Sequence, residues 1–240
     1  MKLAIVGRGM MGSLIEDMAR EHPGIEAVTA IERARGESLF DVADDAAPDV
    51  VIDFSHPDML AEICRYISRR QDKTGIVFGT TGFSNVQLEE IQRLGELAPV
   101  IQSYNYSYGI HALKKLLACA MPMLHDRADI EIIEKHHNRK VDAPSGTALL
   151  LAGICDPAHQ RNWLCGRQGE GKRQNEIGIH SLRGGTIFGE HTIHFALEDE
   201  VIEVSHAAFS KRIFAKGALE AAVWLNGKKR GIYSIEDVFY

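Results

Sequence analysis

Short apolar runs alternate with stretches of helical periodicity over the first hundred residues of the chain. Between the runs, apolar residues recur three and four positions apart, as at Met11, Leu14, Ile15 and Met18, which predicts amphipathic helices. Strands that alternate with helices favour an α/β fold with a parallel, doubly wound sheet of the Rossmann type. The predicted strands are Lys2–Gly7, Ala27–Ile31, Val50–Phe54, Gly75–Phe78 and Pro99–Ser103.

The second half of the chain has a different pattern, in which one helix precedes several strands. Apolar residues such as Leu113 and Leu117 lie on one face of a helix predicted over Ile110–Leu124. We expect Cys155–Asn175, which is polar and rich in Gly, Arg and Gln, to be a long loop, and Phe214–Leu225 to be a last helix. The remaining strands should form an open, mixed or largely antiparallel sheet in a second α+β domain. These strands are Asp129–His137, Ile177–Arg183, Thr186–Leu197 and Val201–Ala208.

Composition narrows the range of functions. The chain has 240 residues, 45% of them hydrophobic and 25% charged, which is enough for one large domain or two modest ones. A formal net charge of −6 without a Lys/Arg cluster gives no indication of nucleic-acid binding, and no apolar run is long enough to span a membrane. Glycines and Arg8 interrupt the first apolar run too early for a signal peptide. The four cysteines are scattered and form no CxxC motif, so a cytoplasmic location is the simplest expectation.

A GxGxxG motif, Gly7-Arg8-Gly9-Met10-Met11-Gly12, joins the first predicted strand to the first predicted helix. Gly7 allows a tight turn, Gly9 lets a pyrophosphate approach the backbone, and Gly12 lets the helix pack closely on the strand. A glycine-rich turn without a ligand is the alternative. The strand–turn–helix context favours a dinucleotide, so we expect all six residues to contact the cofactor.

An acidic residue and two arginines follow the second predicted strand, about 20 positions after the glycines. Glu32 stands where an acid accepts a hydrogen bond from the ribose 2′-hydroxyl of NAD, whereas Arg33 and Arg35 can meet the 2′-phosphate of NADP. Either NADH or NADPH is therefore expected as the cofactor. A surface ion pair is the alternative interpretation of these charges.

Sheets of this type bind their cofactor outside the carboxyl ends of the strands. Asp53-Phe54-Ser55 follows the third predicted strand and is expected to lie there. The loops after the fourth and fifth strands should line the nicotinamide side of the same crevice. Their predicted cofactor contacts are Gly79, Thr80, Thr81, Ser103, Tyr104, Asn105 and Tyr106.

The stretch from Glu131 to Ala148 combines a strand, a cationic loop and the start of a helix. His136, His137 and Lys140 lie in or beside the loop, and Ser145 is a plausible N-cap for the helix that follows. Helix N-termini bind carboxylates and phosphates, and lysine adds a mobile positive charge. A solvated loop with an ordinary cap would explain each part alone, but their order favours a site for a small anion.

The run HHNRKVDAPSGTA, which begins at His136, resembles the signature of the dihydrodipicolinate reductase family of bacterial lysine biosynthesis. The likeness includes the DFS segment at Asp53, the GTTG loop at Gly79 and the RGGxxxGEH pattern that begins at Arg183. It extends from Gly7 to about residue 225. The glycine turn differs, because it is one residue shorter than the GxxGxMG form of many members.

The resemblance implies a reductase that acts on 4-hydroxy-tetrahydrodipicolinate. Water is lost to give dihydrodipicolinate, hydride goes to ring C4 and a proton to C3, and tetrahydrodipicolinate is formed. His136 is implied as the proton donor, with Lys140 as the alternative donor and as a cation for a cyclic dicarboxylate. The implied substrate contacts are His137, Ser145, Gly146, Thr147 and Lys211.

The resemblance also implies a discontinuous domain arrangement. Residues 1–106 and 217–240 would form the dinucleotide-binding domain, and residues 107–216 a domain for substrate binding and oligomerisation. The family forms tetramers through sheets of the second kind, so a homotetramer is expected. We further expect hinges at residues 106–107 and 216–217, where the chain passes between the domains, and closure around the substrate.

Two other functions are alternatives to this reductase. A non-catalytic NAD(P)-binding sensor would need a damaged central motif, whereas this motif is intact; another small Rossmann dehydrogenase acting on an amino or hydroxy acid is the second alternative. A metal site at His191 and His194 is disfavoured because residues three apart on a strand face opposite sides. We therefore predict no metal site.

Overall fold

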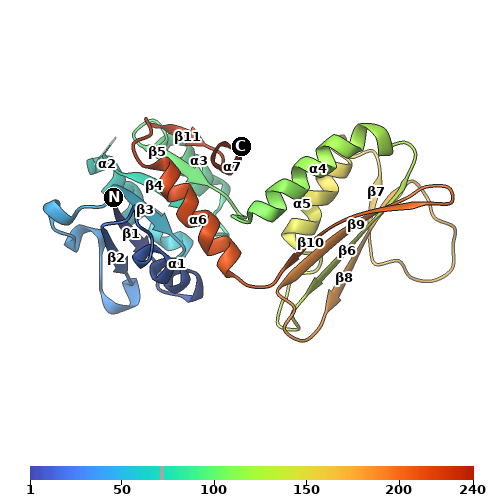
Figure 1. The fold of residues 1–240 in the computed structure, drawn as a ribbon, viewed down its shortest axis with the longest axis horizontal. Helices are drawn as coiled ribbons and strands as arrows, with labels where there is room; N and C mark the ends of the chain where they lie inside the picture. The colour runs from blue at the N-terminus through green and yellow to red at the C-terminus, as the bar shows by residue number, and fades with distance from the viewer. Residues whose placement is uncertain (71–72) are drawn as a thin grey trace. The chain divides into compact units, whose positions relative to one another are not determined.

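The computed structural model describes residues 1–70 and 73–240, and the chain divides into two compact units (Figure 1). The first unit comprises Met1–Tyr108 together with Arg212–Tyr240, and the second comprises Gly109–Lys211. Each unit has its own sheet and its own hydrophobic core.

The sheet of the first unit has six strands in the order β11-β5-β4-β3-β1-β2, all of them parallel. The inner strands carry runs of Val and Ile that are buried on both faces, as expected when helices cover both sides. The strands are β1 (Lys2–Val6), β2 (Ala27–Ile31), β3 (Val50–Asp53), β4 (Gly75–Phe78), β5 (Pro99–Gln102) and β11 (Gly231–Tyr233).

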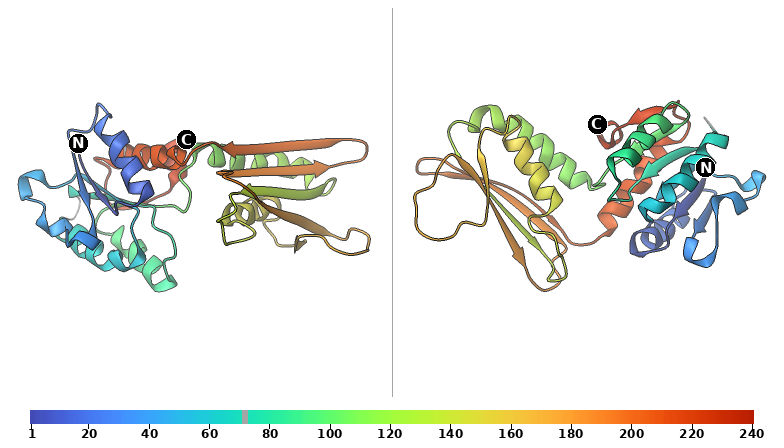
Figure 2. Two further views of the ribbon diagram at one scale, coloured as in Figure 1. Left: turned by 90° about the horizontal axis from the view of Figure 1, so that it is seen from below. Right: turned by 180° about the vertical axis from the view of Figure 1, so that it is seen from behind.

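Helices pack on both faces of this sheet (Figures 1 and 2). One core joins α2 and α3 to the sheet, and the other joins α1 and α6 to its opposite face. The predicted Rossmann-type fold is therefore confirmed. The helices are α1 (Met10–Arg20), α2 (Leu60–Arg70), α3 (Asn85–Leu94), α6 (Arg212–Leu225) and α7 (Ile235–Phe239), with short 3₁₀ turns at Arg33–Arg35, Leu39–Asp41, Asp44–Ala46 and Pro57–Met59.

The sheet of the second unit is mixed, which confirms the second part of the predicted fold. Its order is β10-β9-β6-β8-β7, in which β6 runs parallel to β8 and antiparallel to β9. The strands are β6 (Asp129–His136), β7 (Asn162–Cys165), β8 (Glu176–Arg183), β9 (Gly189–Ala196) and β10 (Val201–Ala208).

Two helices, α4 (Tyr108–Leu124) and α5 (Gly146–Cys155), contribute to the same core as one face of this sheet. Apolar residues of β6 such as Ile130 and Ile132 point into this core, while Glu131 and Ile133 face the other side. The expectation of a continuous loop over 155–175 is wrong, because β7 pairs in parallel with β8 inside that segment.

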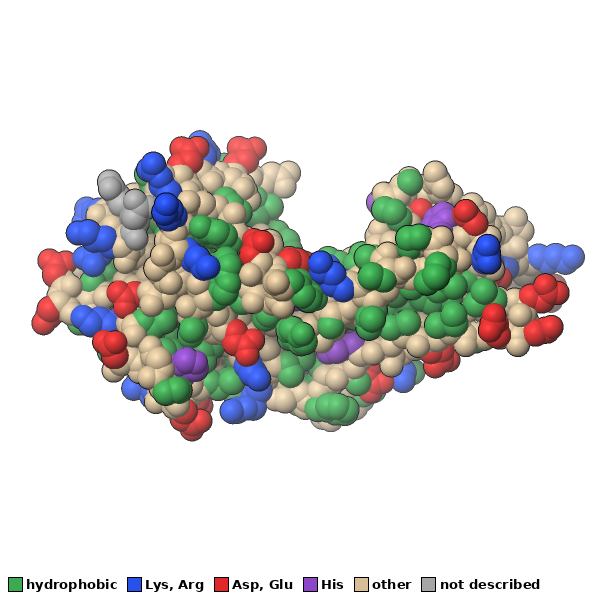
Figure 3. Space-filling view, turned by 45° about the horizontal axis from the view of Figure 1, so that its top comes forward, with side chains coloured by type: hydrophobic (Ala, Val, Ile, Leu, Met, Phe, Trp, Pro, Cys, Tyr) green, Lys and Arg blue, Asp and Glu red, His purple; other side chains and the backbone are tan. Residues whose placement is uncertain are grey.

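Hydrophobic side chains also reach the surface of the molecule (Figure 3). In the second unit these include Leu116 and Met123 on α4 and Leu149 and Leu150 on α5. Within the described ranges, none of the helices combines the length and hydropathy needed to cross a bilayer.

Candidate active site

The glycine turn after β1 is shaped by close backbone contacts. Gly7 has a φ of 93°, and a Cβ atom there would lie 2.6 Å from the carbonyl oxygen of Phe54. A Cβ at Gly12 would lie 1.8 Å from the carbonyl oxygen of Gly7, so α1 packs directly on the turn. In the described part of the chain, apart from Gly9 itself and its two neighbours in sequence, no atom lies within 4 Å of the Cβ position of Gly9, the N-cap of α1. The turn thus leaves open backbone at a helix N-terminus, where a pyrophosphate can approach.

Glu32 is tied to this turn through its carboxylate. It accepts hydrogen bonds from the backbone N–H of Arg8, at 3.0 Å, and of Ala34, at 3.3 Å. The guanidinium of Arg8 pairs instead with Glu16, at 3.3 Å, and Arg33 is exposed. The acid therefore stands beside the glycine turn, with Arg33 next to it in the chain.

A pocket of about 300 Å³ opens at the carboxyl ends of these strands. It is bounded by the glycine turn, by Glu32 and Arg33, and by the loop after β3. His56 and Asp58, which sequence reasoning did not select, also line it, and both side chains are exposed, with His56 Nδ1 at 3.2 Å from a carboxylate oxygen of Asp58. The pocket is lined by Val6, Gly7, Gly9, Glu32, Arg33, Phe54, Ser55, His56, Asp58 and Met59.

The loop after β4 is packed against the loop after β3. A Cβ at Gly79 would lie 2.2 Å from the ring of Phe54, and the hydroxyl of Thr80 accepts a hydrogen bond from Ser55 N–H at 2.9 Å. Thr80 is buried, whereas Thr81 is exposed. Thr80 thus holds the pocket wall together, and Thr81 is accessible from solvent.

The segment after β5 contains one exposed and one buried tyrosine. Tyr104 is 61% exposed, and the Ser103 hydroxyl donates to the carbonyl of Asn105 at 2.8 Å. Tyr106 is buried, its hydroxyl donates to the carbonyl oxygen of Phe78 at 2.7 Å, and burial raises its pKa. Its ring lies 5.9 Å from that of Phe54, so Tyr106 supports the pocket wall from within the core.

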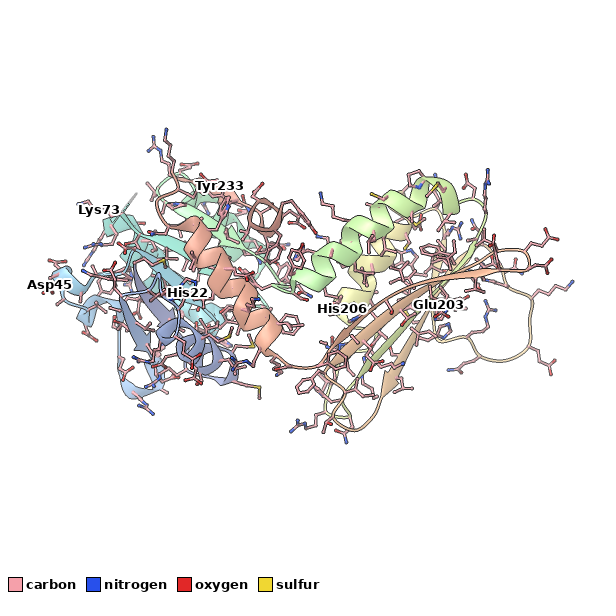
Figure 4. The ribbon with its side chains drawn as sticks, in the orientation of Figure 1. His22, Asp45, Lys73, Glu203, His206 and Tyr233 are labelled. Carbon is pink, nitrogen blue, oxygen red and sulfur yellow. The ribbon has the colours of Figure 1, made fainter. Side chains whose placement is uncertain are left out.

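In the second unit, the inner face of the sheet changes from apolar to polar toward the end of β6. Aligned residues form one row of Ile177, Ile130, Phe195 and Ile202 and a next row of Ile179, Ile132, Ile193 and Val204. The third row is polar and consists of Ser181, Glu134, His191 and His206. His206 is labelled on β10 in Figure 4.

Glu134 is at the centre of this polar end, and none of its side chain is exposed. One carboxylate oxygen lies 2.5 Å from His136 Nδ1 and 2.9 Å from an Arg183 nitrogen. The other accepts from Arg183 at 2.6 Å and from the Ser145 N–H at 3.1 Å. Together with His191, these residues are called the inner cluster.

Electrostatic effects in the inner cluster follow from burial and from these contacts. Burial alone would raise the pKa of Glu134, but hydrogen bonds from Arg183, Ser181 and His136 lower it to about 2. Burial lowers the pKa of His136, and its contact with Glu134 opposes that shift. Burial also lowers the pKa of His191, to about 4. A carboxylate and a neutral His191 are thus the stable forms near neutral pH.

The hydroxyl and the backbone N–H of Ser145 both make hydrogen bonds within the protein. Its hydroxyl accepts the Ala148 N–H at 3.2 Å, which caps α5, and lies 3.0 Å from His191 Nε2. Its own N–H is bound to Glu134. Gly146, the first residue of α5, is exposed, and its N–H has no acceptor within the helix. Gly146 and Thr147 therefore bring the helix N-terminus to the inner cluster.

The cationic loop leaves Lys140 near this helix start. Its ammonium lies 2.8 Å from a carboxylate oxygen of Asp142, whose backbone carbonyl accepts from Arg183. His137 Nδ1 is buried and has no hydrogen-bond partner among the described residues. Lys211, three residues after β10, makes no hydrogen bond or ion pair with the inner cluster in the described part of the chain.

His191 and His194 face opposite sides of β9, because His191 is buried in the inner cluster and His194 pairs with Glu203 at 2.9 Å. Across residues 1–70 and 73–240, no three His, Cys, Asp or Glu side chains are grouped as around a metal ion. Sequence reasoning assigned no role to Glu134 or to Arg183, although Arg183 begins the RGGxxxGEH pattern. The signal available for Glu134 was its position on the apolar face of an alternating strand.

Comparison with known proteins decides the family. A family model described as "Dihydrodipicolinate reductase, N-terminus" matches residues 1–106, and one described as "Dihydrodipicolinate reductase, C-terminus" matches residues 109–239. The chain belongs to the dihydrodipicolinate reductase family. Members of this family are oxidoreductases that use a pyridine nucleotide.

Relatives within the family match the whole chain. A 4-hydroxy-tetrahydrodipicolinate reductase of Clostridium novyi is 41% identical, with 96% of this chain and 94% of the relative covered. The enzyme of the same name from Exiguobacterium sibiricum is 42% identical, with 100% and 96% covered. The fold is similar to that of a dipicolinate-bound dihydrodipicolinate reductase from Paenisporosarcina sp. TG-14, with a TM-score of 0.78, 24% identity, and 97% and 96% of the two chains covered.

Proposed function

We propose that this protein reduces 4-hydroxy-tetrahydrodipicolinate, through dihydrodipicolinate, to tetrahydrodipicolinate in diaminopimelate and lysine biosynthesis. The observation that carries the proposal is the inner cluster, in which a histidine is held beside a cationic loop and a helix N-terminus. That combination suits a dianionic substrate that must also receive a proton. Full-length relatives bear the name of this activity.

The cofactor is NADH or NADPH, and it supplies the hydride that goes to ring C4. The open backbone at Gly9 fits a pyrophosphate, and Glu32 fits the ribose 2′-hydroxyl. Arg33 is exposed beside the same pocket and fits a 2′-phosphate. The loops at Gly79–Thr81 and Ser103–Tyr106 serve the nicotinamide side, with Thr80 and Tyr106 acting through the pocket wall.

The substrate carboxylates are held by Lys140 and by the N-terminus of α5 at Gly146 and Thr147. His136 gives a proton from Nε2 to ring C3, and imidazole suits this role because it titrates near neutral pH. His137 donates or accepts a substrate hydrogen bond, and Lys211 adds a second cation. Lys140 is the alternative proton donor.

The proposed domain functions follow the same division of tasks. Residues 1–106 and 217–240 bind the dinucleotide, and residues 107–216 bind substrate and join subunits into a homotetramer. The expected hinge at 216–217 falls inside α6, so closure is proposed at the two passages between the units, near residues 108–109 and 211–212, where it would exclude water from the reaction. A cytoplasmic location is proposed because all four cysteines are free thiols.

An absorbance assay at the NADH band tests the activity, with purified dihydrodipicolinate synthase generating the substrate. We expect oxidation of both cofactors that depends on the synthase product. Because Glu32 favours one cofactor and Arg33 the other, kcat/KM for the two should differ by less than about 3 kcal/mol, or about 150-fold. Omission of the synthase is the control. Absence of product-dependent oxidation with either cofactor contradicts the proposal.

A further inference from the structure

We propose that Glu134 is the positioning residue of this site: it holds His136 with Nδ1 protonated and Nε2 facing the substrate, and it ties the same carboxylate to the start of α5. This inference rests on the proposed function, because it assigns a task to a residue beside the proposed proton donor. Glu134 itself touches neither substrate nor cofactor.

The first argument is that the carboxylate is saturated with donors. Each oxygen of Glu134 receives one contact from Arg183 and one from either His136 Nδ1 or Ser145 N–H, and Ser181 adds a further hydrogen bond to the carboxylate. An ionised carboxylate offers about four lone-pair sites, so all of them are used. A donor is therefore required at His136 Nδ1, because a bare ring nitrogen there would face a carboxylate oxygen at 2.5 Å.

The second argument concerns the other ring nitrogen. With Nδ1–H bound to Glu134, Nε2 is the nitrogen that exchanges its proton with a substrate carbon and with solvent. Gly189 is opposite His136 on β9, and a Cβ atom there would lie 3.0 Å from Nε2. The glycine leaves space at the nitrogen that has to act. After proton transfer to C3, the ring is neutral with its remaining proton on Nδ1, and Nε2 regains a proton from solvent.

The third argument is that Arg183 neutralises the negative charge of the Glu134 carboxylate and fixes its orientation. Arg183 binds both oxygens of Glu134 and also donates to the backbone carbonyl of Asp142 in the cationic loop. The carboxylate thus connects β6, β8, the loop and α5. A bidentate Arg–carboxylate pair fixes orientation as well as charge, so the histidine and the helix start keep a constant spacing.

The same strand provides a matched control. Glu131 faces the opposite side of β6, where its carboxylate contacts His180 at 2.8 Å and Arg173 at 3.2 Å. These three residues are called the outer cluster. It contains the same three residue types but no link to a helix N-terminus. Glu131→Gln therefore removes a carboxylate from a His–Glu–Arg group without changing His136.

The first measurement needs no variant. Two-bond ¹H–¹⁵N correlation spectra of the ¹⁵N-histidine-labelled protein, with His136 assigned by its loss in His136→Ala, report which ring nitrogen carries the proton above the imidazole titration. We expect the Nδ1–H tautomer at His136. A dominant Nε2–H tautomer overturns the proposal. Because this readout does not depend on activity, it decides the inference even if the enzyme does not reduce the proposed substrate.

The second measurement compares Glu134→Gln with Glu131→Gln, after folding is checked by circular dichroism. Glu134→Gln should lower kcat by about 10- to 100-fold, as when the partner of a functional imidazole is removed, with cofactor affinity unchanged. Loss of the charge that opposes the burial effect should also move the alkaline limb of the kcat profile to lower pH. Glu131→Gln should change kcat by less than about twofold.

Equal effects of the two substitutions, or a Glu134→Gln profile that differs from the wild type only in height, show a structural role and overturn the proposal. If Glu134→Gln does not fold, the tautomer in the wild-type protein remains decisive. If the wild-type protein does not reduce the substrate but His136 carries Nδ1–H, the proposed function fails and the positioning of the ring by Glu134 stands.

Discussion

The inner and outer clusters use the same residue types on opposite faces of one sheet, but they differ in solvent access and in connection. None of Glu134 and 12% of His136 is exposed in the inner cluster, against 25% of Glu131 and 37% of His180 in the outer cluster. Only the inner carboxylate also binds the start of a helix. Glu131 and Glu134 are three residues apart, and strand alternation alone directs them to opposite faces. The difference between the two clusters therefore comes from α5, which covers the inner face of the sheet at Glu134.

Replacement of the two histidines should give the largest contrast. We expect His136→Ala to lower kcat by about 10²- to 10⁴-fold, because a positioned acid contributes by this factor. His180→Ala should leave kcat within about twofold of wild type, since the ring lies on the other face of the sheet. Steady-state kinetics with both cofactors measures this difference.

A third variant, Lys140→Ala, tests the alternative proton donor. It should raise KM as well as lower kcat, because it removes a cation that faces a dianionic substrate. If His136→Ala keeps near-normal kcat while Lys140→Ala abolishes it, the proton donor is Lys140. Near-normal activity of both variants contradicts the proposed site.

Removal of the two arginines should separate the clusters by stability. Arg183→Leu leaves the fully buried Glu134 without its bidentate partner, and we expect a loss of about 3–5 kcal/mol in the free energy of unfolding. Arg173→Leu should cost about 1–2 kcal/mol, because the carboxylates it leaves can regain water. Urea unfolding at pH 7 measures both values. If Arg183→Leu and Arg173→Leu lower the free energy of unfolding equally, burial of Glu134 does not determine the loss of stability.

Two histidines of β9 extend the comparison to pH dependence. Burial depresses the pKa of His191 to about 4, so the unfolded chain binds more protons than the folded chain between about pH 6.5 and 4. Stability should fall as pH is lowered through this window, by a contribution on the order of 3 kcal/mol. Glu134, with a pKa of about 2, loses its contribution only below about pH 4.

His191→Gln should flatten the dependence of unfolding free energy on pH above pH 4, and His194→Gln is the control for loss of a histidine from the same strand. Urea titrations at closely spaced pH values give the slopes. A slope that is unchanged in His191→Gln shows that protons taken up elsewhere cause the acid destabilisation.

The smallest expected effect concerns Ser145. Its hydroxyl is used by the Ala148 N–H and by His191, so Ser145→Ala should cost about 1 kcal/mol of stability, the usual value for an N-cap. The KM for substrate should rise only a few-fold, because Gly146 and Thr147 still present the helix start. Thermal unfolding and steady-state kinetics test the two parts. A large rise in KM shows that the hydroxyl turns toward the substrate.

The sequence predicted most elements of both sheets because their strands have strong hydrophobic patterns. The valine and isoleucine runs of β1 and β3 and the alternation in β6 leave little choice of structure. The short strand β7 was missed, since its four residues stand among glycines and charges and depend on pairing with β8. Pairing with a distant strand leaves no local pattern.

Side-chain tasks within the sites were harder to predict than their location. The GxGxxG turn and the HHNRK loop predict where the sites lie, but they do not show that Tyr106 is buried beneath the pocket wall. They also do not show that the Ser145 hydroxyl accepts the Ala148 N–H and contacts His191. Glu134 was overlooked because β6 also carries Asp129, Glu131 and Lys135, and a charged side chain on such a strand is usually assumed to face solvent. Its partner Arg183 is 49 positions away, and sequence spacing gives no sign of the pair.

That separation has a consequence for how the chain folds. Burial of Glu134 before β8 has docked would place an uncompensated carboxylate beneath α5, which is strongly unfavourable. The inner face of β6 can therefore lose its water only when Arg183 has bound Glu134. The pairing of β6 with β8 and the docking of α5 should then occur in one cooperative step. Contacts of such long range are typical of slow steps in folding. A chain released before β8 is complete would keep this end of β6 hydrated, and the proposed proton donor would have no fixed orientation.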